Sequence, residues 1–239
     1  MKGQVGERFG EFYEKWVSEL DECWQQLLRV SKERSLSTNS SGEEEQIQAL
    51  VSKLTAHYKQ YYTVKWVAAH EDVLAFFCPM WLSSVEIAYS WVTGWRPCMM
   101  FRMVESMRKT REPGLSLAEM TDEQVKKMEE LRGKIRIEEE RVEREMERLQ
   151  VVVADKKMVE LVKLQRINQV EALVEVALKG LTMGLERVVK AADCVRLKTL
   201  KGVLDILSPL QCVNFLAGTC LVHIQLRQQG NRRDTHHDQ

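Results

Sequence analysis

The feature that most constrains the fold is an aromatic-rich stretch at residues 66–102, WVAAHEDVLAFFCPMWLSSVEIAYSWVTGWRPCMMFR. It holds four of the six tryptophans in the chain, together with two phenylalanines in a row. Aromatic side chains of this size bury about 150–250 Å² each and dominate the core that they enter. We therefore expect this stretch to form an inner scaffold that the other segments cover.

Signals for helix ends divide the aromatic stretch into short pieces. Pro79 is expected to end one helix, because proline lacks an N–H group and disfavours helical geometry in the residue before it. Ser83 and Glu86 have the spacing of a capping box, which starts a second helix. Gly94 is expected to end it as a left-handed C-cap, and Pro97 to open the next helix. The buried face of the second helix is predicted to carry Val85, Ala88, Tyr89 and Val92.

Amphipathic patterns account for most of the remaining chain. Apolar residues recur every three or four positions, which is the period of one buried helical face, in the segments 9–27, 47–65, 125–150, 151–207 and 213–226. No alternating strand pattern is present. The sequence therefore predicts an all-α protein, a multi-helix bundle with long antiparallel helices around an aromatic-rich centre.

The expected breaks between these helices follow polar residues and prolines. Residues 31–42 are rich in Ser, Thr and Asn and predict a loop, after which Ser41 and Glu44 offer a capping box. Residues 112–114, Glu-Pro-Gly, mark the clearest boundary, and Ser116 with Glu119 is expected to restart a helix. Residues 208–211, Ser-Pro-Leu-Gln, predict the start of the last helix.

The segment 125–150 is highly charged and carries only a narrow apolar seam. Such a seam is typical of a solvated helix with one coiled-coil-like face. Two interpretations stay open: the helix packs within its own bundle, or it binds a partner or forms a homodimer. Within 151–207, Gly180 and Gly184 are expected to mark a kink or a close helix contact.

Composition excludes several classes of protein. Lysines and arginines balance aspartates and glutamates at 35 each, and no basic stripe is visible, so direct DNA binding is not expected. The six cysteines form no CxxC pair, which favours buried free thiols in a reducing compartment. The apolar region 73–95 is interrupted by Pro79 and Glu86, so we expect a buried core and no membrane span. The first residues lack the apolar core of a signal peptide.

The chain shows no constellation of catalytic residues. Phosphate-binding, HExxH and GxSxG motifs are absent, so no enzymatic activity is expected. His57, His70 and His223 are interpreted as hydrogen-bonded structural residues. His236 and His237 are the candidate cofactor-binding residues, because neutral imidazole is a good ligand for haem iron. They lie in the polar tail 230–239, which is predicted to be disordered.

Three segments resemble the plant delay-of-germination (DOG) domain: FYEKWVSEL near the start, the block from His57 to Val104, and LDILSPLQCVNFLAGTCLVHIQLRQQG at the end. The specific part is WLSSVEIAYSWVTGWRP at residues 81–97. The resemblance implies a domain over residues 9–229, with an N-terminal extension at 1–8. The same domain follows the basic leucine zipper (bZIP) of TGA-type transcription factors, but too few residues precede Phe9 for a zipper. A stand-alone DOG-like protein is therefore expected.

The resemblance implies a regulatory, non-catalytic role in seed dormancy, abscisic-acid signalling or transcription regulation, exerted through protein binding in the nucleus and cytoplasm. Its expected partners are type-2C protein phosphatases or bZIP transcription factors. The alternative is a sensor of haem or of a lipid, because some relatives bind haem and the TGA domain accommodates a fatty acyl ligand.

Overall fold

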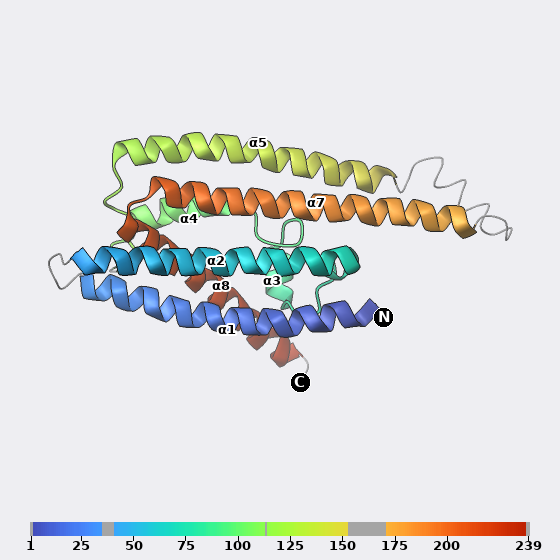
Figure 1. Cartoon of the computed structure of the whole chain (residues 1–239), viewed down its shortest axis with the longest axis horizontal. Coiled ribbons are helices and arrows are strands. Elements are labelled where there is room, and N and C mark those ends of the chain that lie inside the picture. Colours follow the sequence, from blue (N-terminus) through green and yellow to red (C-terminus); the bar gives the residue numbers. More distant parts are fainter. Residues whose placement is uncertain (1, 35–40, 113, 153–170, 238–239) are drawn as a thin grey trace.

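The computed structural model describes residues 2–34, 41–112, 114–152 and 171–237 (Figure 1). In this part of the chain the secondary structure consists of seven α-helices and one 3-10 helix, without a strand. The helices are α1 (Lys2–Arg34), α2 (Ser41–Glu71), η1 (Val73–Phe76), α3 (Ser84–Ala88), α4 (Cys98–Lys109), α5 (Asp122–Val152), α7 (Glu171–Ile206) and α8 (Pro209–His237). The all-α prediction is confirmed.

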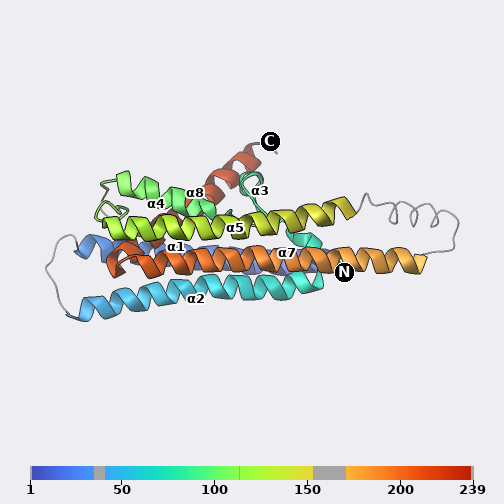
Figure 2. The same cartoon turned by 90° about the horizontal axis from the view of Figure 1, so that it is seen from above.

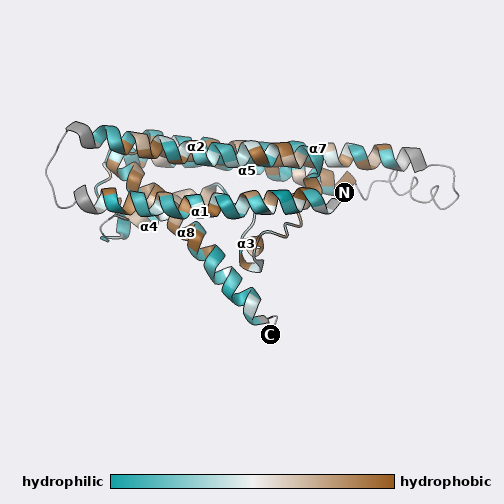
Figure 3. Ribbon diagram, turned by 60° about the horizontal axis from the view of Figure 1, so that its bottom comes forward, coloured by the Kyte–Doolittle hydropathy of each residue, from teal (hydrophilic) through white to brown (hydrophobic). Residues whose placement is uncertain are grey.

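Four long helices lie side by side in the order α5, α7, α2, α1, each antiparallel to its neighbour (Figure 1). Helix α8 crosses this layer obliquely and packs against α1, α2 and α4. Viewed from above, α4 and α8 lie on one side of α5 and α7 (Figure 2). The C-terminal half of α8 and the short α3 project together from the layer, and the projecting end of α8 is mostly hydrophilic (Figure 3).

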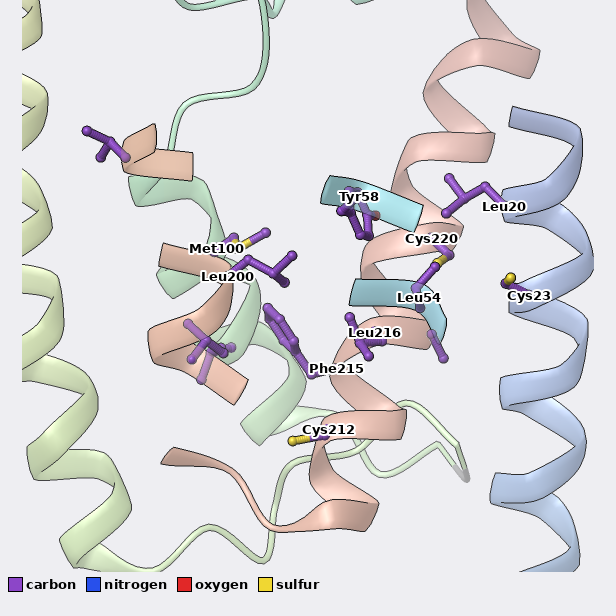
Figure 4. Packing of buried hydrophobic residues seen from close by; sticks show 14 of the residues in the cluster. Leu20, Cys23, Leu54, Tyr58, Met100, Leu200, Cys212, Phe215, Leu216 and Cys220 are labelled. Carbon is purple, nitrogen blue, oxygen red and sulfur yellow. The ribbon is translucent and has the colours of Figure 1, made fainter. Parts of the chain in front are cut away.

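The core is one apolar cluster that runs between these helices. Figure 4 shows its middle, where Leu20 and Cys23 of α1, Leu54 and Tyr58 of α2, Met100 of α4, Leu200 of α7, and Cys212, Phe215, Leu216 and Cys220 of α8 are buried. Burial of such side chains contributes about 1.5–3 kcal/mol each, so the amphipathic stripes become one shared interior. Of the six cysteines, Cys23, Cys212 and Cys220 are buried free thiols as expected, whereas Cys78 and Cys194 are exposed.

The aromatic centre is present, but its composition differs from the prediction. Phe9 of α1 packs edge-on against Phe76, with ring centroids 4.8 Å apart, and lies 4.9 Å from Trp81. Trp16 lies 4.8 Å from the ring of Tyr61 on α2. Within residues 66–102, Trp81 is buried, but the other three tryptophans are half-buried. Helices α1 and α2 therefore supply much of the aromatic core.

The capping box at Ser83 and Glu86 is confirmed. The Ser83 hydroxyl accepts from the Glu86 N–H, and the Glu86 carboxylate accepts from the Ser83 N–H at 2.9 Å. The predicted ends of the neighbouring helices are wrong. Helix α2 stops at Glu71, well before Pro79, and Asp72 caps the 3-10 helix that follows by accepting from Leu74 N–H. Helix α3 stops at Ala88, which leaves Tyr89 exposed and breaks the predicted buried face.

The corner after α3 is a tight loop, and Gly94 does not have the expected left-handed conformation. The positive φ angles belong to Val92 (41°) and Thr93 (62°). This conformation is costly for β-branched residues and persists only where surrounding contacts impose it. Gly94 is needed for another reason, because an added Cβ would lie 3.0 Å from Cζ of Arg196. Pro97 then begins α4 as predicted.

Three more helix starts are predicted, and two are confirmed, because α2 begins at Ser41 and α8 at Pro209. At the start of α8, the Ser208 N–H donates to the Gln211 side chain at 2.9 Å. Helix α5, however, does not begin at Ser116. It begins at Asp122, where Thr121 and Gln124 exchange side-chain and backbone hydrogen bonds of 3.0 and 3.2 Å. The predicted loop at 31–42 is wrong at both ends, because residues 31–34 belong to α1 and residues 41–42 to α2; residues 35–40 lie outside the described part of the chain.

The tail is not disordered up to His237, because α8 continues to that residue. Contacts between this segment and the start of α3 explain why it is helical and not disordered. Gly230 packs so closely on α3 that an added Cβ would lie 2.0 Å from the Ser83 hydroxyl. Asp234 accepts from the Ser84 N–H at 2.9 Å and from its hydroxyl. These contacts order a polar segment that its composition alone left unstructured.

Helix α5 packs along α7, which confirms that it lies within its own bundle. Contact is close at Gly184 and Gly202, where an added Cβ would lie 2.6 Å from Leu149 and 2.8 Å from Leu131. Gly180, the other glycine predicted to mark a contact, has no neighbour within 4 Å. Whether the outer face of α5 also binds a partner or a second copy stays a prediction.

The glycine contacts allow a matched test of helix packing. Gly184→Leu should lower the free energy of unfolding by about 1–3 kcal/mol, because the new side chain overpacks the α5–α7 contact. Gly180→Leu should leave it unchanged or raise it by up to about 1 kcal/mol, because leucine favours a helix more than glycine does. Urea unfolding followed by circular dichroism measures both. Equal shifts for the two variants would show that Gly184 is not a contact position.

Candidate functional site

A cavity of ≈ 120 Å³ lies where six helices meet. Its walls come from α1, α2, α3, α4, α7 and α8 and from the loop between α3 and α4. Its lining combines aromatic rings with buried charges: Tyr13, Trp16, Tyr58, Tyr61, Tyr62, Lys65, Leu82, Glu86, Tyr89, Ser90, Thr93, Gly94, Trp95, Met99, Asp193, Arg196, His223 and Leu226. We call it the aromatic cavity. It brings together residues from distant parts of the chain, from Tyr13 to Leu226.

One wall is a fully buried charged cluster of Lys65, Asp193 and Arg196, which are at most 1% exposed. The Asp193 carboxylate accepts from Lys65 Nζ at 2.9 Å and from Arg196 Nη1 at 2.5 Å. Its second oxygen accepts from the indole N–H of Trp66 at 3.1 Å. Buried charges are tolerated only when they are paired and hydrogen-bonded, and this cluster meets that condition.

The two cations of this cluster hold the loop that follows α3. Arg196 donates to the carbonyls of Trp91, Val92 (2.9 Å) and Trp95 (2.7 Å). Lys65 donates to the carbonyl and the hydroxyl of Thr93 at 3.0 and 2.9 Å. Carbonyls of four residues in the loop are therefore fixed by groups on α2 and α7, which explains how positive φ angles persist there.

Helix α5 holds the outer side of the same loop. Glu143 accepts from the indole N–H of Trp91 at 3.0 Å and from Arg96 at 2.7 Å. The buried Glu139 accepts from the Cys98 N–H at 2.6 Å, which places a negative charge at the N-terminus of α4. The loop is thus clamped from both sides.

Burial also shifts the pKa values of ionisable side chains in this wall. It lowers the pKa of Lys65 to about 8, and the Asp193 carboxylate opposes that shift. Burial raises the pKa of Tyr61 and of Tyr62 above the ordinary value, with Asp193 adding to the effect. These phenols stay neutral at physiological pH, so they act as hydrogen-bonding groups and not as anions.

A second charged cluster closes the opposite wall and joins α1, α3 and α8. The Glu86 carboxylate accepts from Tyr13 Oη at 2.9 Å and from Arg227 Nη1 at 3.1 Å. Arg227 also donates to the carbonyl of Trp81 at 2.9 Å and to Glu14, and its guanidinium lies 4.9 Å from the centre of the Tyr13 ring. Glu86 therefore serves two purposes, because the same carboxylate completes the α3 capping box.

The histidines behave as the structural residues that the sequence predicted. His57 stacks on Trp16 at 4.9 Å, and its Nε2 lies 3.0 Å from the Trp16 carbonyl. Nε2 of His223 lies 3.1 Å from the Tyr13 hydroxyl, and burial lowers the pKa of His223 to about 4. His70 pairs with Glu186 at 3.0 Å. Each imidazole therefore has a partner within the fold.

The cavity therefore has a defined shape, and the charged side chains that line it are held in contacts within the fold. Its carboxylates and cations neutralise one another, and burial raises the pKa of Tyr13 and of the adjacent Cys220 thiol away from reactive values. Its mouth is apolar and accessible, with Tyr89 63% and Met99 42% exposed. Exposed aromatic and Met side chains beside a concave site are typical of binding surfaces.

The predicted cofactor residues lie elsewhere. His236 is exposed near the end of α8, among the polar residues 231–235, and the side chain of His237 lies outside the described residues. The described surroundings of His236 do not form the apolar slot that would fit a haem. No group of three or more His, Cys, Asp or Glu side chains in the described part of the chain is arranged to hold a metal ion. Haem binding through His236 and His237 stays a prediction.

The sequence reasoning missed the buried charges. A charged, solvated helix is predicted for residues 125–150, and no carboxylate is named as part of the core, whereas Asp193 is fully buried. A usable signal was present, since Lys65 sits in the apolar stripe of YYTVKWVAA and Asp193 with Arg196 in VVKAADCVRL. Charged residues of both signs within the apolar stripes of helices indicate a buried ion pair.

Comparisons with known proteins bear on this arrangement. The family described as Seed dormancy control (DOG1) matches residues 26–106. The chain is 52% identical to Protein DOG1-like 4 of Arabidopsis thaliana over 235 residues, which cover 98% of the chain and 96% of the relative. It is 30% identical to Protein ZW2 (94% and 96% covered) and 29% identical to Protein RESPONSE TO ABA AND SALT 1 (82% and 84% covered), both of Arabidopsis thaliana.

Among the described helices, none is long and apolar enough to cross a membrane.

The charged cluster yields a stability prediction. Asp193→Ala should lower the free energy of unfolding by about 3–5 kcal/mol, because it leaves two buried cations without a counter-charge. Asp205→Ala is the matched control on the same helix, since Asp205 is exposed and pairs with the exposed Lys201; it should change stability by less than about 0.5 kcal/mol. Thermal or urea unfolding measures both. A small effect of Asp193→Ala would show that the cluster is hydrated.

His223 yields a pH prediction. Its folded-state pKa of about 4 lies below the ordinary value of 6.5, so the unfolded chain binds a proton more readily than the fold does. The stability contributed by neutral His223 is complete above about pH 6.5 and is lost as the pH falls towards 4, by an amount on the order of 3 kcal/mol. Urea unfolding at pH 7.5, 5.5 and 4.5 should show a steeper loss for the wild type than for His223→Gln. If the free energy of unfolding falls equally with pH in the two proteins, the prediction for His223 is wrong.

Proposed function

Because the chain belongs to the DOG1 seed-dormancy-control family, we propose that it is a regulatory protein that acts by binding other proteins through the surface around the aromatic cavity. Relatives are named for dormancy control and for the response to abscisic acid and salt. A role in seed dormancy or abscisic-acid signalling, or in transcription regulation, is the process that these names favour.

The single observation that carries this proposal is the combination of a fixed corner and an apolar mouth. The loop after α3 is clamped by Lys65, Arg196 and Glu143, so its exposed side chains are held in one arrangement before any partner arrives. Pre-organised surfaces bind with a smaller loss of conformational entropy. The charges behind the mouth are consumed in internal contacts, which favours a binding surface over a reaction centre.

The proposed partners are type-2C protein phosphatases or bZIP transcription factors, in the nucleus and cytoplasm. Both follow from the resemblance to stand-alone dormancy regulators and to the TGA-type domain. Direct DNA contact is not part of the proposal, because the chain is electrically balanced, with 35 basic and 35 acidic residues.

A binding experiment with purified proteins tests the proposed function. The double variant Tyr89→Ser/Met99→Ser should weaken binding to a type-2C phosphatase or a TGA-type factor at least tenfold, because it removes the apolar mouth while changing only exposed side chains. The matched control is Val67→Ser/Val176→Ser, which alters two exposed apolar residues, 62% and 67% accessible, on α2 and α7.

Calorimetry or surface plasmon resonance gives the dissociation constants, and circular dichroism verifies that each variant folds. If the two double variants bind equally well, the mouth is not the interaction surface. If the wild type binds neither class of protein, the proposed partners are wrong.

A further inference from the structure

We propose that the aromatic cavity receives one uncharged aromatic side chain with a hydrogen-bonding tip, a tyrosine or tryptophan, presented by the partner protein. This inference rests on the proposed function and specifies which residue of the partner anchors the complex. Four features of the cavity support it: its volume, its aromatic walls, its internal charge balance and an unused hydroxyl group.

The volume of the cavity limits the occupant to a single aromatic side chain. At ≈ 120 Å³ it is somewhat smaller than the ~150 Å³ cavity known to hold benzene. Pockets for drug-sized molecules and cofactors start at about 300 Å³. A side chain that enters with its ring and leaves its backbone at the mouth matches this size.

The walls provide the ring contacts that an aromatic occupant requires. Trp16 and Tyr61 lie 4.8 Å apart at 45°, and Tyr61 and Tyr62 lie 5.1 Å apart at 82°. Tilted and edge-on arrangements of this kind leave ring faces and edges available to a further ring. Leu226 of α8 and Leu82, which precedes α3, add aliphatic surface.

The charges of the cavity exclude a charged occupant. Two cations, Lys65 and Arg196, and two anions, Asp193 and Glu86, line it. Each is already paired within the fold: Asp193 accepts from both cations, and Glu86 accepts from Arg227. An arginine, lysine or carboxylate entering the cavity would lose its hydration without gaining a counter-ion. Of the three residue types that dominate interface hot spots, Trp, Tyr and Arg, only the first two remain.

A hydroxyl group in the wall is available for the polar tip of the occupant. The Tyr61 phenol forms no hydrogen bond with any described residue, although it lies among the rings of Phe9, Tyr13 and Trp16. Tyr61 lines the same cavity as the carboxylates of Asp193 and Glu86. A phenol or indole N–H from the partner would satisfy it, whereas an aliphatic side chain would leave it unpaired.

The test uses single-residue probes and the full-length protein. N-acetyl-tyrosinamide and N-acetyl-tryptophanamide should bind with millimolar dissociation constants, measured by chemical-shift titration in NMR. N-acetyl-leucinamide and N-acetyl-argininamide should bind at least fivefold more weakly, because the first lacks a polar tip and the second carries a charge. Equal binding of all four probes, or binding of none, would overturn the proposal.

Two tryptophan substitutions on α8 locate the binding. Leu226→Trp fills the cavity from its wall and should abolish binding of the tyrosine probe. Val222→Trp is the matched control, because Val222 is 46% exposed and does not line the cavity, and it should leave binding unchanged. If Leu226→Trp does not fold, Met99→Trp at the exposed rim replaces it. Probe binding that survives in the folded variant with the added tryptophan would contradict the assigned site.

The partner experiment separates this inference from the proposed function. If Leu226→Trp retains full affinity for the partner protein while Tyr89→Ser/Met99→Ser loses it, the mouth binds the partner but the cavity holds no anchor. If both variants lose at least tenfold in affinity and the control Val222→Trp does not, the anchor is confirmed.

Discussion

The structure depends on one buried electrostatic arrangement, the carboxylate of Asp193 between the cations of Lys65 and Arg196. All three groups are removed from water, so each must find its full set of partners inside the protein. The cations find them in the carbonyls of residues 91–95, which explains why a loop with two β-branched residues at positive φ has a single conformation. The same contacts bring α2 and α7 together around the loop.

The cavity follows from this arrangement. Because the loop is held by its backbone, the side chains of Tyr89, Thr93 and Trp95 surround a space and do not collapse into it. On the opposite side, Glu86 and Arg227 fasten α3 and α8 to α1. The space left between the two charged walls is small, aromatic and open to solvent at one end. The charged groups that line it are engaged in contacts within the fold.

Much of the fold could be predicted from local patterns. The amphipathic stripes on α1, α2, α5, α7 and α8 predicted long helices, and the residues around Ser83 and Ser208 predicted two helix starts, because capping depends on neighbours only three residues apart. The failures have two causes. The early end of α2 coincides with a local cap at Asp72, which starts the next helix. The tight loop after α3 and the ordered end of α8 depend on contacts with residues far along the chain, such as Arg196 with Val92 and Asp234 with Ser84. The candidate site was missed for the same reason, since a charged residue on a helix does not reveal whether its partner lies in solvent or on another helix.

The sequence by itself determined the class of the protein, the aromatic centre and the family resemblance, because periodicity, ring content and short motifs are properties of contiguous residues. Only the tertiary structure decided where the charges lie. Lys65 and Asp193 are separated by well over a hundred residues, and their contact exists only when α2 and α7 pack side by side. The cavity between the helices is likewise a property of their arrangement, because its walls come from six helices and one loop that no local pattern brings together.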